Sequence, residues 1–272
     1  MKPYNKLTEK DKKNIVENYY NKKELSKREL AIFCNVSVRS IARVLKEEGI
    51  NTKLKNKYTL NDNYFETIDT EHKAYWLGFL YADGYVGDEN CNNIVIGLCE
   101  KDIEQLESFK KDIQYTGNIR TSKNSGGYNT KYKGVVINFS SKKMASDLRN
   151  LGLYPGKSTT MKHMPEMPND LYKHFIRGYF DGDGSISHII RNDQYKGHRF
   201  IMTIIGTIDF LNEVDEKLPV KTYKKSCNNT ENMQYLRCQK KEDMKKLYHY
   251  LYDDSTIYLK RKYEIWKDII NY

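Results

Sequence analysis

The chain has 272 residues, enough for one large domain or two ordinary ones with a substantial hydrophobic core. Its 46 Lys and Arg residues against 36 Asp and Glu residues give a formal net charge of +10, and such a basic excess is typical of proteins that bind nucleic acid. No apolar run approaches the length of a transmembrane helix and no signal-peptide pattern opens the sequence, so we expect a soluble, cytoplasmic protein without a membrane partner.

The five cysteines form no CxxC pair, and the histidines offer no zinc-binding spacing. They are Cys34, Cys91, Cys99, Cys227 and Cys238. We therefore expect reduced thiols in the core or on the surface, and neither a disulfide framework nor a structural zinc ion.

Residues 1–50 are predicted to form a small all-α domain of three helices. Thr8 begins a capping-box pattern at the first helix, and Ser26 and Ser37 stand at the N-caps of the second and third. The turn between the last two helices is very short and contains Asn35, a residue type that tolerates left-handed backbone angles.

These three helices resemble a helix-turn-helix DNA-binding domain. The resemblance implies that the third helix enters the major groove of DNA. The residues that it would present are Ser37, Arg39, Ser40 and Arg43. The alternative is a helical module of the same geometry that does not contact DNA.

The rest of the chain is predicted to be a linker followed by two similar halves. Residues 51–71 are polar and lack a clear hydrophobic period, so they form the linker. The first half covers 72–152, a proline-containing connection covers 153–168, and the second half covers 169–272. Each half is predicted to follow the order αββαββα.

The expected strands lie at corresponding places in the two halves. They are 85–88, 94–99, 117–122 and 134–140 in the first half, and 185–191, 199–206, 220–225 and 233–238 in the second. The helices expected between and after them are 101–113, 141–152, 208–217 and 240–252, with a last helix over 255–270.

The clearest internal repeat is a nine-residue motif that occurs twice, one hundred residues apart. Residues 76–84 read WLGFLYADG and residues 176–184 read IRGYFDGDG. Each copy is predicted to be a helix that ends at an Asp-Gly pair, with a left-handed glycine as the helix stop, and turns directly into a strand. The matched residues are Gly78, Ala82, Asp83 and Gly84 in the first copy and Gly178, Gly182, Asp183 and Gly184 in the second.

The motif places a carboxylate at a helix C-terminus, where the helix dipole opposes it by about 0.3–1 kcal/mol. Small residues four positions apart on one face of each helix would let the two helices pack closely. These interface residues are Gly78, Ala82, Gly178 and Gly182. Close parallel packing would bring Asp83 and Asp183 side by side, and they would repel each other unless a cation lay between them. One copy alone would indicate a capping turn, whereas the pair predicts a metal site.

With this motif pair, the internal duplication and the basic charge, residues 72–270 resemble the LAGLIDADG homing endonucleases in their single-chain, two-motif form. The segments GLYPGKS and YLKRKY are also similar to that family. The first copy departs from the family's letters at Trp76, Leu77 and Tyr81, but the acidic eighth position is intact in both copies. The resemblance implies an α+β class: a duplicated αββαββα homing-endonuclease fold with pseudo-twofold symmetry, whose two antiparallel sheets form a saddle over DNA.

The resemblance also implies a function. The protein would be a homing endonuclease that hydrolyses both strands of a long, non-palindromic DNA site and leaves a staggered cut, as in intron homing. Asp83 and Asp183 would bind the divalent cation, Mg²⁺ or Mn²⁺, with help from the backbone carbonyls of Ala82 and Gly182. Because both halves lie in one chain, a monomer is expected.

In related enzymes a basic residue at the end of the last strand of each half stabilises charge at the site. The nearest basic residues here are Lys142 and Lys240, which are the further catalytic candidates. Strand residues whose alternation turns them toward the saddle are the candidate DNA contacts. They are Arg120, Lys123, Lys131, Lys133 and Asn138 in the first half, and Arg191, Arg199, Thr203, Lys221, Lys224, Lys225 and Arg237 in the second.

The sequence leaves two other functions open. The same fold can serve as a maturase that binds its own intron RNA, and a basic surface rich in tyrosine would suit that partner. A DNA-binding transcriptional regulator with a decayed nuclease body is the second alternative. Retention of both acids and of the motif glycines argues against decay.

Overall fold

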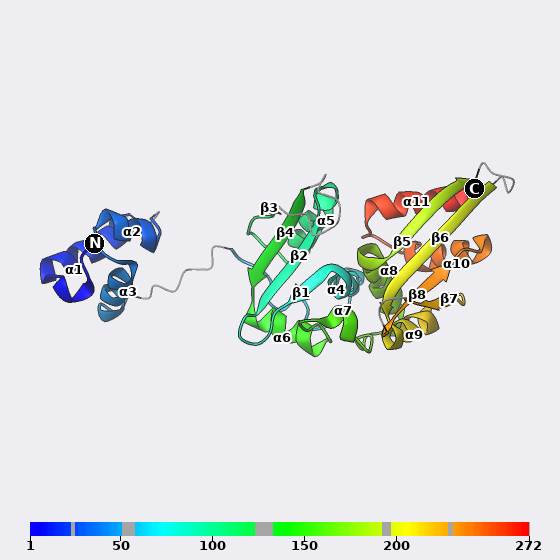
Figure 1. Ribbon diagram of the computed structural model, residues 1–272, viewed down its shortest axis with the longest axis horizontal. Coiled ribbons are helices and arrows are strands. Elements are labelled where there is room, and N and C mark those ends of the chain that lie inside the picture. Colours follow the sequence, from blue (N-terminus) through cyan, green and yellow to red (C-terminus); the bar gives the residue numbers. More distant parts are fainter. Residues whose placement is uncertain (23–24, 51–57, 123–132, 192–196, 228–230, 272) are drawn as a thin grey trace. The chain divides into compact units, whose positions relative to one another are not determined.

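The computed structural model describes residues 1–22, 25–50, 58–122, 133–191, 197–227 and 231–271. The chain divides into two compact units, Met1–Lys57 and Tyr58–Tyr272, each of which has its own hydrophobic core (Figure 1). Within the described ranges, no helix has both the length and the apolar character needed to cross a membrane.

The N-terminal unit is built from three helices. They are α1 (Glu9–Asn21), α2 (Lys27–Phe33) and α3 (Val38–Glu47), preceded by a short 3₁₀ turn, η1 (Tyr4–Lys6). Thr8 and Ser26 complete the capping boxes of α1 and α2, and the Ser37 hydroxyl accepts the backbone N–H of Ser40 at the start of α3. Asn35 has φ 53° in the turn between α2 and α3, so the expected left-handed residue is present.

The core of this unit is small and aliphatic. Its buried residues come from all three helices and from the turn between the last two. They are Ile15, Leu30, Ala31, Val36, Ile41, Val44 and Leu45. The unit therefore has an aliphatic core of its own, separate from that of the larger unit.

The larger unit contains the same series of elements twice. The first half has α4 (Glu71–Asp83), β1 (Gly84–Val86), β2 (Asn93–Cys99), η2 (Glu100–Asp102), α5 (Ile103–Asp112), β3 (Arg120–Ser122), β4 (Gly134–Ser140) and α6 (Lys142–Asn150). The connection has α7 (Lys157–Thr160) and η3 (Asn169–Leu171). The second half has α8 (Tyr172–Asp183), β5 (Ser185–Arg191), β6 (Gly197–Thr207), α9 (Ile208–Lys217), β7 (Tyr223–Ser226), β8 (Met233–Cys238), α10 (Lys241–Tyr252) and α11 (Lys260–Asn271).

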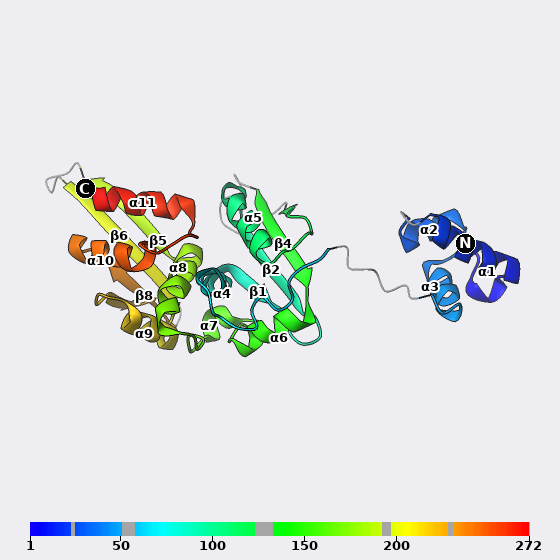
Figure 2. The same ribbon diagram turned by 180° about the vertical axis from the view of Figure 1, so that it is seen from behind.

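Each half forms one four-stranded antiparallel sheet, and the two sheets have the same strand order. The orders are β1-β2-β4-β3 and β5-β6-β8-β7. Alternation along the strands buries one face of each sheet, with residues such as Ile94, Ile96, Ile204 and Leu236. Helices cover these buried faces, as the reverse view shows (Figure 2). The predicted α+β architecture with two equivalent halves is confirmed.

The motif helices α4 and α8 pack directly against each other. A Cβ atom built on Gly78 would lie 1.9 Å from the Phe175 carbonyl oxygen, and one built on Gly178 would lie 1.9 Å from the Tyr75 carbonyl oxygen. Real Cβ atoms essentially never come that close to another heavy atom. The two backbones therefore touch at these glycines, in two equivalent contacts.

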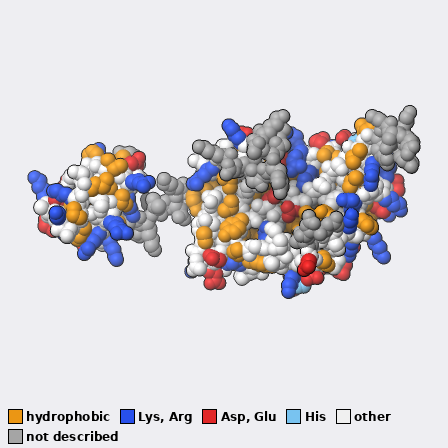
Figure 3. Space-filling model, viewed as in Figure 1, with side chains coloured by type: hydrophobic (Ala, Val, Ile, Leu, Met, Phe, Trp, Pro, Cys, Tyr) orange, Lys and Arg blue, Asp and Glu red, His pale blue; other side chains and the backbone are white. Residues whose placement is uncertain are grey.

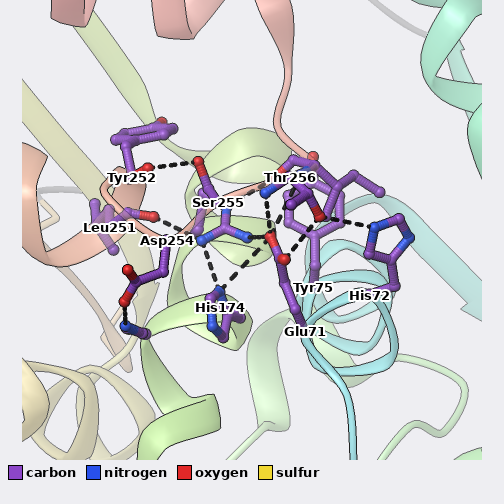
Figure 4. Close-up of polar contacts among 12 residues, drawn as sticks. Glu71, His72, Tyr75, His174, Leu251, Tyr252, Asp254, Ser255 and Thr256 are labelled. Atoms are coloured by element: carbon purple, nitrogen blue, oxygen red, sulfur yellow. Dashed lines mark hydrogen bonds and ion pairs between the residues drawn. The ribbon is translucent and has the colours of Figure 1, made fainter.

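A buried ion pair ties α4 and α8 to the segment before α11. The fully buried Arg177 donates from Nη2 to Glu71 Oε1 at 2.6 Å and from Nε to the Ile257 carbonyl at 2.9 Å. Figure 4 shows Glu71, His174 and Thr256 converging from three parts of the chain. Burial lowers the pKa of His174 to about 4, so its neutral Nδ1 accepts a hydrogen bond from Arg177 Nη1 at 2.8 Å.

The predicted bounds of the linker and of the last helix are wrong. The predicted linker over 51–71 is too long, because Tyr64, Phe65 and Ile68 are buried in the core of the larger unit. The last helix begins at Lys260 rather than at 255, and the segment before it is held by Glu71, whose Oε1 accepts the backbone N–H of Thr256.

Gly178→Ala should destabilise the larger unit by about 1–3 kcal/mol, because the added methyl group forces α4 and α8 apart. Chemical denaturation monitored by circular dichroism measures the change. Gly97→Ala is the matched control, since a Cβ there would meet only the Val135 carbonyl oxygen at 3.9 Å. Equal unfolding midpoints for the two variants would contradict the close helix contact.

Candidate active site at the paired helix ends

The two motif acids occupy the last residues of α4 and α8. Asp83 ends α4 and Asp183 ends α8, and each helix is followed without a loop by a strand. The expected left-handed glycine stops are wrong: Gly84 has φ −84° and Gly184 has φ −80°, both extended. These glycines are needed for space, because a Cβ on Gly184 would lie 2.5 Å from the Phe180 carbonyl oxygen.

The glycine contact between the helices brings the ends of α4 and α8 together. A Cβ on Gly182 would lie 2.3 Å from the Cβ of Ala82 and 3.3 Å from Oδ2 of Asp83. The Asp83 carboxylate thus lies directly against the last turn of α8, although solvent reaches it. The four predicted interface residues take part in this contact.

The pKa values of Asp83 and Asp183 are both raised, and the two carboxylates lie close enough for the charge of Asp183 to act on Asp83. Burial and then the negative charge of Asp183 raise the pKa of Asp83 to about 6. Burial likewise raises the pKa of Asp183. Both acids would therefore be stabilised by any positive charge close to them.

Two buried lysines supply such charge. Lys262 of α11 donates from Nζ to the carbonyls of Phe180 at 2.6 Å, Asp181 at 2.7 Å and Gly184 at 2.5 Å. A longer contact of 3.3 Å reaches the Gly182 carbonyl. The Lys262 ammonium therefore binds the carbonyl groups at the end of α8, one of which, that of Phe180, also accepts the backbone N–H of Gly184.

Lys157 of α7 holds the corresponding place on α4. Its Nζ donates to the Ala82 carbonyl at 3.2 Å, and its side chain is buried. Burial lowers the pKa of Lys157 and lowers that of Lys262 to about 8, while the charges of Asp83 and Asp183 act in the opposite direction on both. Both ammonium groups therefore lie close enough to the motif acids to interact with them, and Lys262 interacts more strongly still with the buried Asp181.

The structure places these lysines, and not the predicted pair, beside the acids. Lys142 is the exposed first residue of α6, and Lys240 is the exposed N-cap of α10. Neither is among the charged groups that shift the pKa of Asp83 or Asp183. The lysines that lie at the motif helix ends are therefore Lys157 and Lys262, and a catalytic role for Lys142 and Lys240 stays a prediction.

The sequence contains a partial indication that Lys157 and Lys262 are important. They lie in the segments GLYPGKS and YLKRKY, which resemble the family without indicating a role. Lys262 lies three residues after Leu259 and four before Trp266, on a helix face whose other residues are buried, and a buried lysine has to reach a polar partner. The sequence could not show that this partner is the end of another helix.

The site chemistry suits a hard divalent cation. The Asp83 and Asp183 carboxylates and the Ala82 and Gly182 carbonyls are all oxygen donors, which Mg²⁺ and Mn²⁺ prefer. Among the described residues, no group of three or more His, Cys, Asp or Glu side chains could hold a metal ion. Water and a substrate phosphate would have to complete the coordination, as is usual for Mg²⁺.

Most of the predicted DNA-contact residues of the two sheets share one outward face. Strand register places Thr203 and Arg237 opposite each other, and Arg120 and Asn138 lie on the corresponding face of the first sheet. The exposed Arg199 and Lys225 continue this face, while Lys133 and Lys221 are exposed just before β4 and β7. On the larger unit, Figure 3 shows Lys and Arg side chains in several places, with hydrophobic and acidic side chains among them.

Lys224 is an exception, and three candidates lie beyond what is described. Lys224 points to the helix side of its sheet, where Nζ lies 2.9 Å from Asn212 Oδ1 and 3.1 Å from Asp215 Oδ2. Lys224 therefore does not share the outward face with the other candidates. Lys123, Lys131 and the side chain of Arg191 lie outside the described residues.

In the N-terminal unit only part of the predicted DNA-contact set is available. Arg39 is exposed on α3, whereas Ser40 is buried and its hydroxyl lies 2.8 Å from that of Ser37, the N-cap. Arg43 lies 3.2 Å from Glu47 Oε1 and stacks 4.1 Å over the Tyr4 ring. Ser40 is therefore withdrawn into the unit, whereas Arg43 stays exposed while it pairs with Glu47 one helical turn away.

Comparison with solved structures identifies the fold. The I-SmaMI LAGLIDADG homing endonuclease bound to cleaved DNA is 12% identical, with a TM-score of 0.52 over 75% of this chain and 89% of that one. The I-LtrWI LAGLIDADG homing endonuclease bound to target DNA is 14% identical, with a TM-score of 0.51 over 78% and 91%. No protein-family model and no curated protein matches the sequence. The larger unit has the fold of single-chain LAGLIDADG homing endonucleases, as the sequence predicts.

Asp83→Asn should stabilise the metal-free protein at pH 8. A raised folded-state pKa means that Asp83 contributes most to stability below its unfolded pKa, and that this contribution is lost as the pH rises through about 6. Thermal unfolding in EDTA should therefore show a higher Tm for the variant at pH 8 and a shrinking difference toward pH 5. Asp268→Asn, an exposed acid on α11, is the control. A lower Tm for Asp83→Asn at pH 8 would refute the crowding of the two acids.

Proposed function

We propose that the protein is a site-specific DNA endonuclease that depends on a divalent metal ion, cuts both strands and leaves staggered ends. The observation that carries this proposal is the meeting of Asp83 and Asp183 at the ends of two touching helices, between two equivalent sheets. The fold supports it, because the similar structures include LAGLIDADG homing endonucleases bound to target and to cleaved DNA.

The outward faces of the two sheets are the proposed DNA-binding surface. They carry exposed cationic and hydrogen-bonding side chains, including Arg120, Asn138 and Arg199. Cationic groups would bind phosphates and give affinity that falls with salt, whereas side chains that reach base edges would give specificity. The outward face of each sheet is not part of the hydrophobic core, because the core is formed by the opposite face.

At the helix ends, Asp83 and Asp183 would hold Mg²⁺ or Mn²⁺, with the Ala82 and Gly182 carbonyls as further ligands. When bound, such an ion activates water and stabilises charge on the phosphate. Lys157 and Lys262 act as positioning residues, because they fix the ends of α4 and α8 through backbone carbonyls. Their buried positive charge also lowers the cost of bringing a phosphodiester to the two acids.

The two halves have the same topology and different sequences, so the target should be long and should lack strict palindromic symmetry. Each acid would serve mainly one strand. Since one chain supplies both halves, a monomer suffices for the double-strand break. Intron homing is the biological setting that the fold suggests.

The N-terminal unit would add a second DNA contact through α3. Arg39 is exposed near its N-terminal end, and Ser37 caps the helix there. Helix-turn-helix modules present this end of the recognition helix to the major groove. In this proposal the unit raises affinity for the target and takes no part in the cut.

Asp83→Asn and Asp183→Asn should each lower the rate of double-strand cleavage by about a hundredfold or more, because each removes a metal ligand. Strand-resolved gels of an end-labelled target with Mg²⁺ measure the rate. Binding should persist in both variants. Asp268→Asn should cleave like the parent. Full cleavage by either motif variant would overturn the assignment, and an uncut promoter or a bound intron RNA would favour the regulator or the maturase.

Arg39→Ala should weaken binding to the target by about 1–3 kcal/mol and reduce its salt dependence. Fluorescence titrations in EDTA at several salt concentrations measure both quantities. Lys10→Ala removes an exposed charge on α1 and is the matched control. If both variants bind like the parent, the N-terminal unit does not contact the target through α3.

A further inference from the structure

A row of three outward residues lies beside Asp83 in the first half. Tyr85 follows the acid by two residues and is 48% exposed. It pairs across the sheet with Val95, and Val95 pairs in turn with Asn138. Because side chains opposite each other in antiparallel strands share a face, these three form one row on the proposed DNA surface.

The second half has an equivalent row beside Asp183. Ser185 follows that acid by two residues and pairs with Thr203, which pairs with Arg237. The strand order is the same as in the first half, so Arg237 stands where Asn138 stands. The two side chains would face corresponding base pairs of the two half-sites.

The first row offers an amide next to an apolar surface. Asn138 is exposed, and its carboxamide has no hydrogen-bond partner among the described residues. Its neighbour Val95 presents only methyl groups, which cannot bind a phosphate. An asparagine carboxamide matches N6 and N7 of adenine, and an apolar neighbour suits the methyl group of thymine.

The second row offers a guanidinium that is already oriented. Arg237 is half-buried and donates from Nε to Thr203 Oγ1 at 3.4 Å. No carboxylate pairs with it in the parts of the chain that the structure describes. The contact through Nε leaves the two terminal nitrogens to form the fork that recognises O6 and N7 of guanine.

We propose that Asn138 reads an adenine in the first half-site and that Arg237 reads a guanine at the corresponding position of the second. This inference rests on the proposed function, because it assumes that the sheets bind duplex DNA. It adds the reason for an asymmetric target: equivalent places in the two rows carry side chains with different base preferences. The asymmetry extends to Tyr85 and Ser185, which differ in size at the ends of the rows nearest the acids.

The first test exchanges the residue types at positions 138 and 237, so that each carries the side chain of the other. Bound sequences are selected from random DNA with an Asp83→Asn and Asp183→Asn protein, so that cutting does not interfere. Asn138→Arg in that protein should change the preferred base at one position from adenine to guanine, and Arg237→Asn should make the reverse change at the other. Each exchange should alter the preference roughly 5- to 150-fold, as expected for a bidentate base contact. Arg199→Asn, on the same face two rows away, should leave both positions unchanged.

The second test leaves the protein unchanged, so it does not depend on folding of a variant. The adenine and the guanine are replaced singly by their 7-deaza analogues, which lack N7. Affinity should fall at these two positions and remain the same at neighbouring purines. Uniform weakening by Arg237→Asn without a change of base preference, or indifference to both analogues, would overturn the inference and indicate phosphate contacts. A protein that keeps both preferences but never cuts would support this inference while refuting the proposed function.

Discussion

The contact between α4 and α8 is the constraint on which the rest of the molecule depends. Gly78 and Gly178 let the two backbones touch, and this brings two negative helix ends and two carboxylates into one place. Such an arrangement is unfavourable unless positive charge is supplied. Lys157 and Lys262 supply it from other elements of the same chain.

The two halves hold the ends of their motif helices with different residues. At the sixth position of the motif, the Tyr81 hydroxyl donates to the Leu151 carbonyl, whereas Asp181 accepts the backbone N–H of Leu259 at 2.7 Å. Each interaction joins the end of a motif helix to the segment that leads to the buried lysine. Duplication has thus preserved geometry while side chains diverged, which is what recognition of an asymmetric DNA site requires.

Much of the fold follows from local patterns, and the errors have physical causes. Strand alternation, capping residues and the small residues of the motif predict the two sheets, the N-terminal helices and the close helix contact. The positions of Lys157 and Lys262 could not be predicted, because they depend on which distant carbonyls the folded chain brings near. The same is true of Lys224, since Asp215 and Asn212 contact it only in the folded protein. Phe65 was missed because a short apolar cluster in a polar segment shows no period.

The most direct measurement of the central claim is Mn²⁺ binding, followed by electron paramagnetic resonance on the full chain bound to its target. The account predicts that bound Mn²⁺ is present in the parent protein and lost in the Asp83→Asn, Asp183→Asn double variant, while DNA binding is retained. Unchanged Mn²⁺ binding in the double variant would contradict the account, because it would place the metal site away from the paired helix ends.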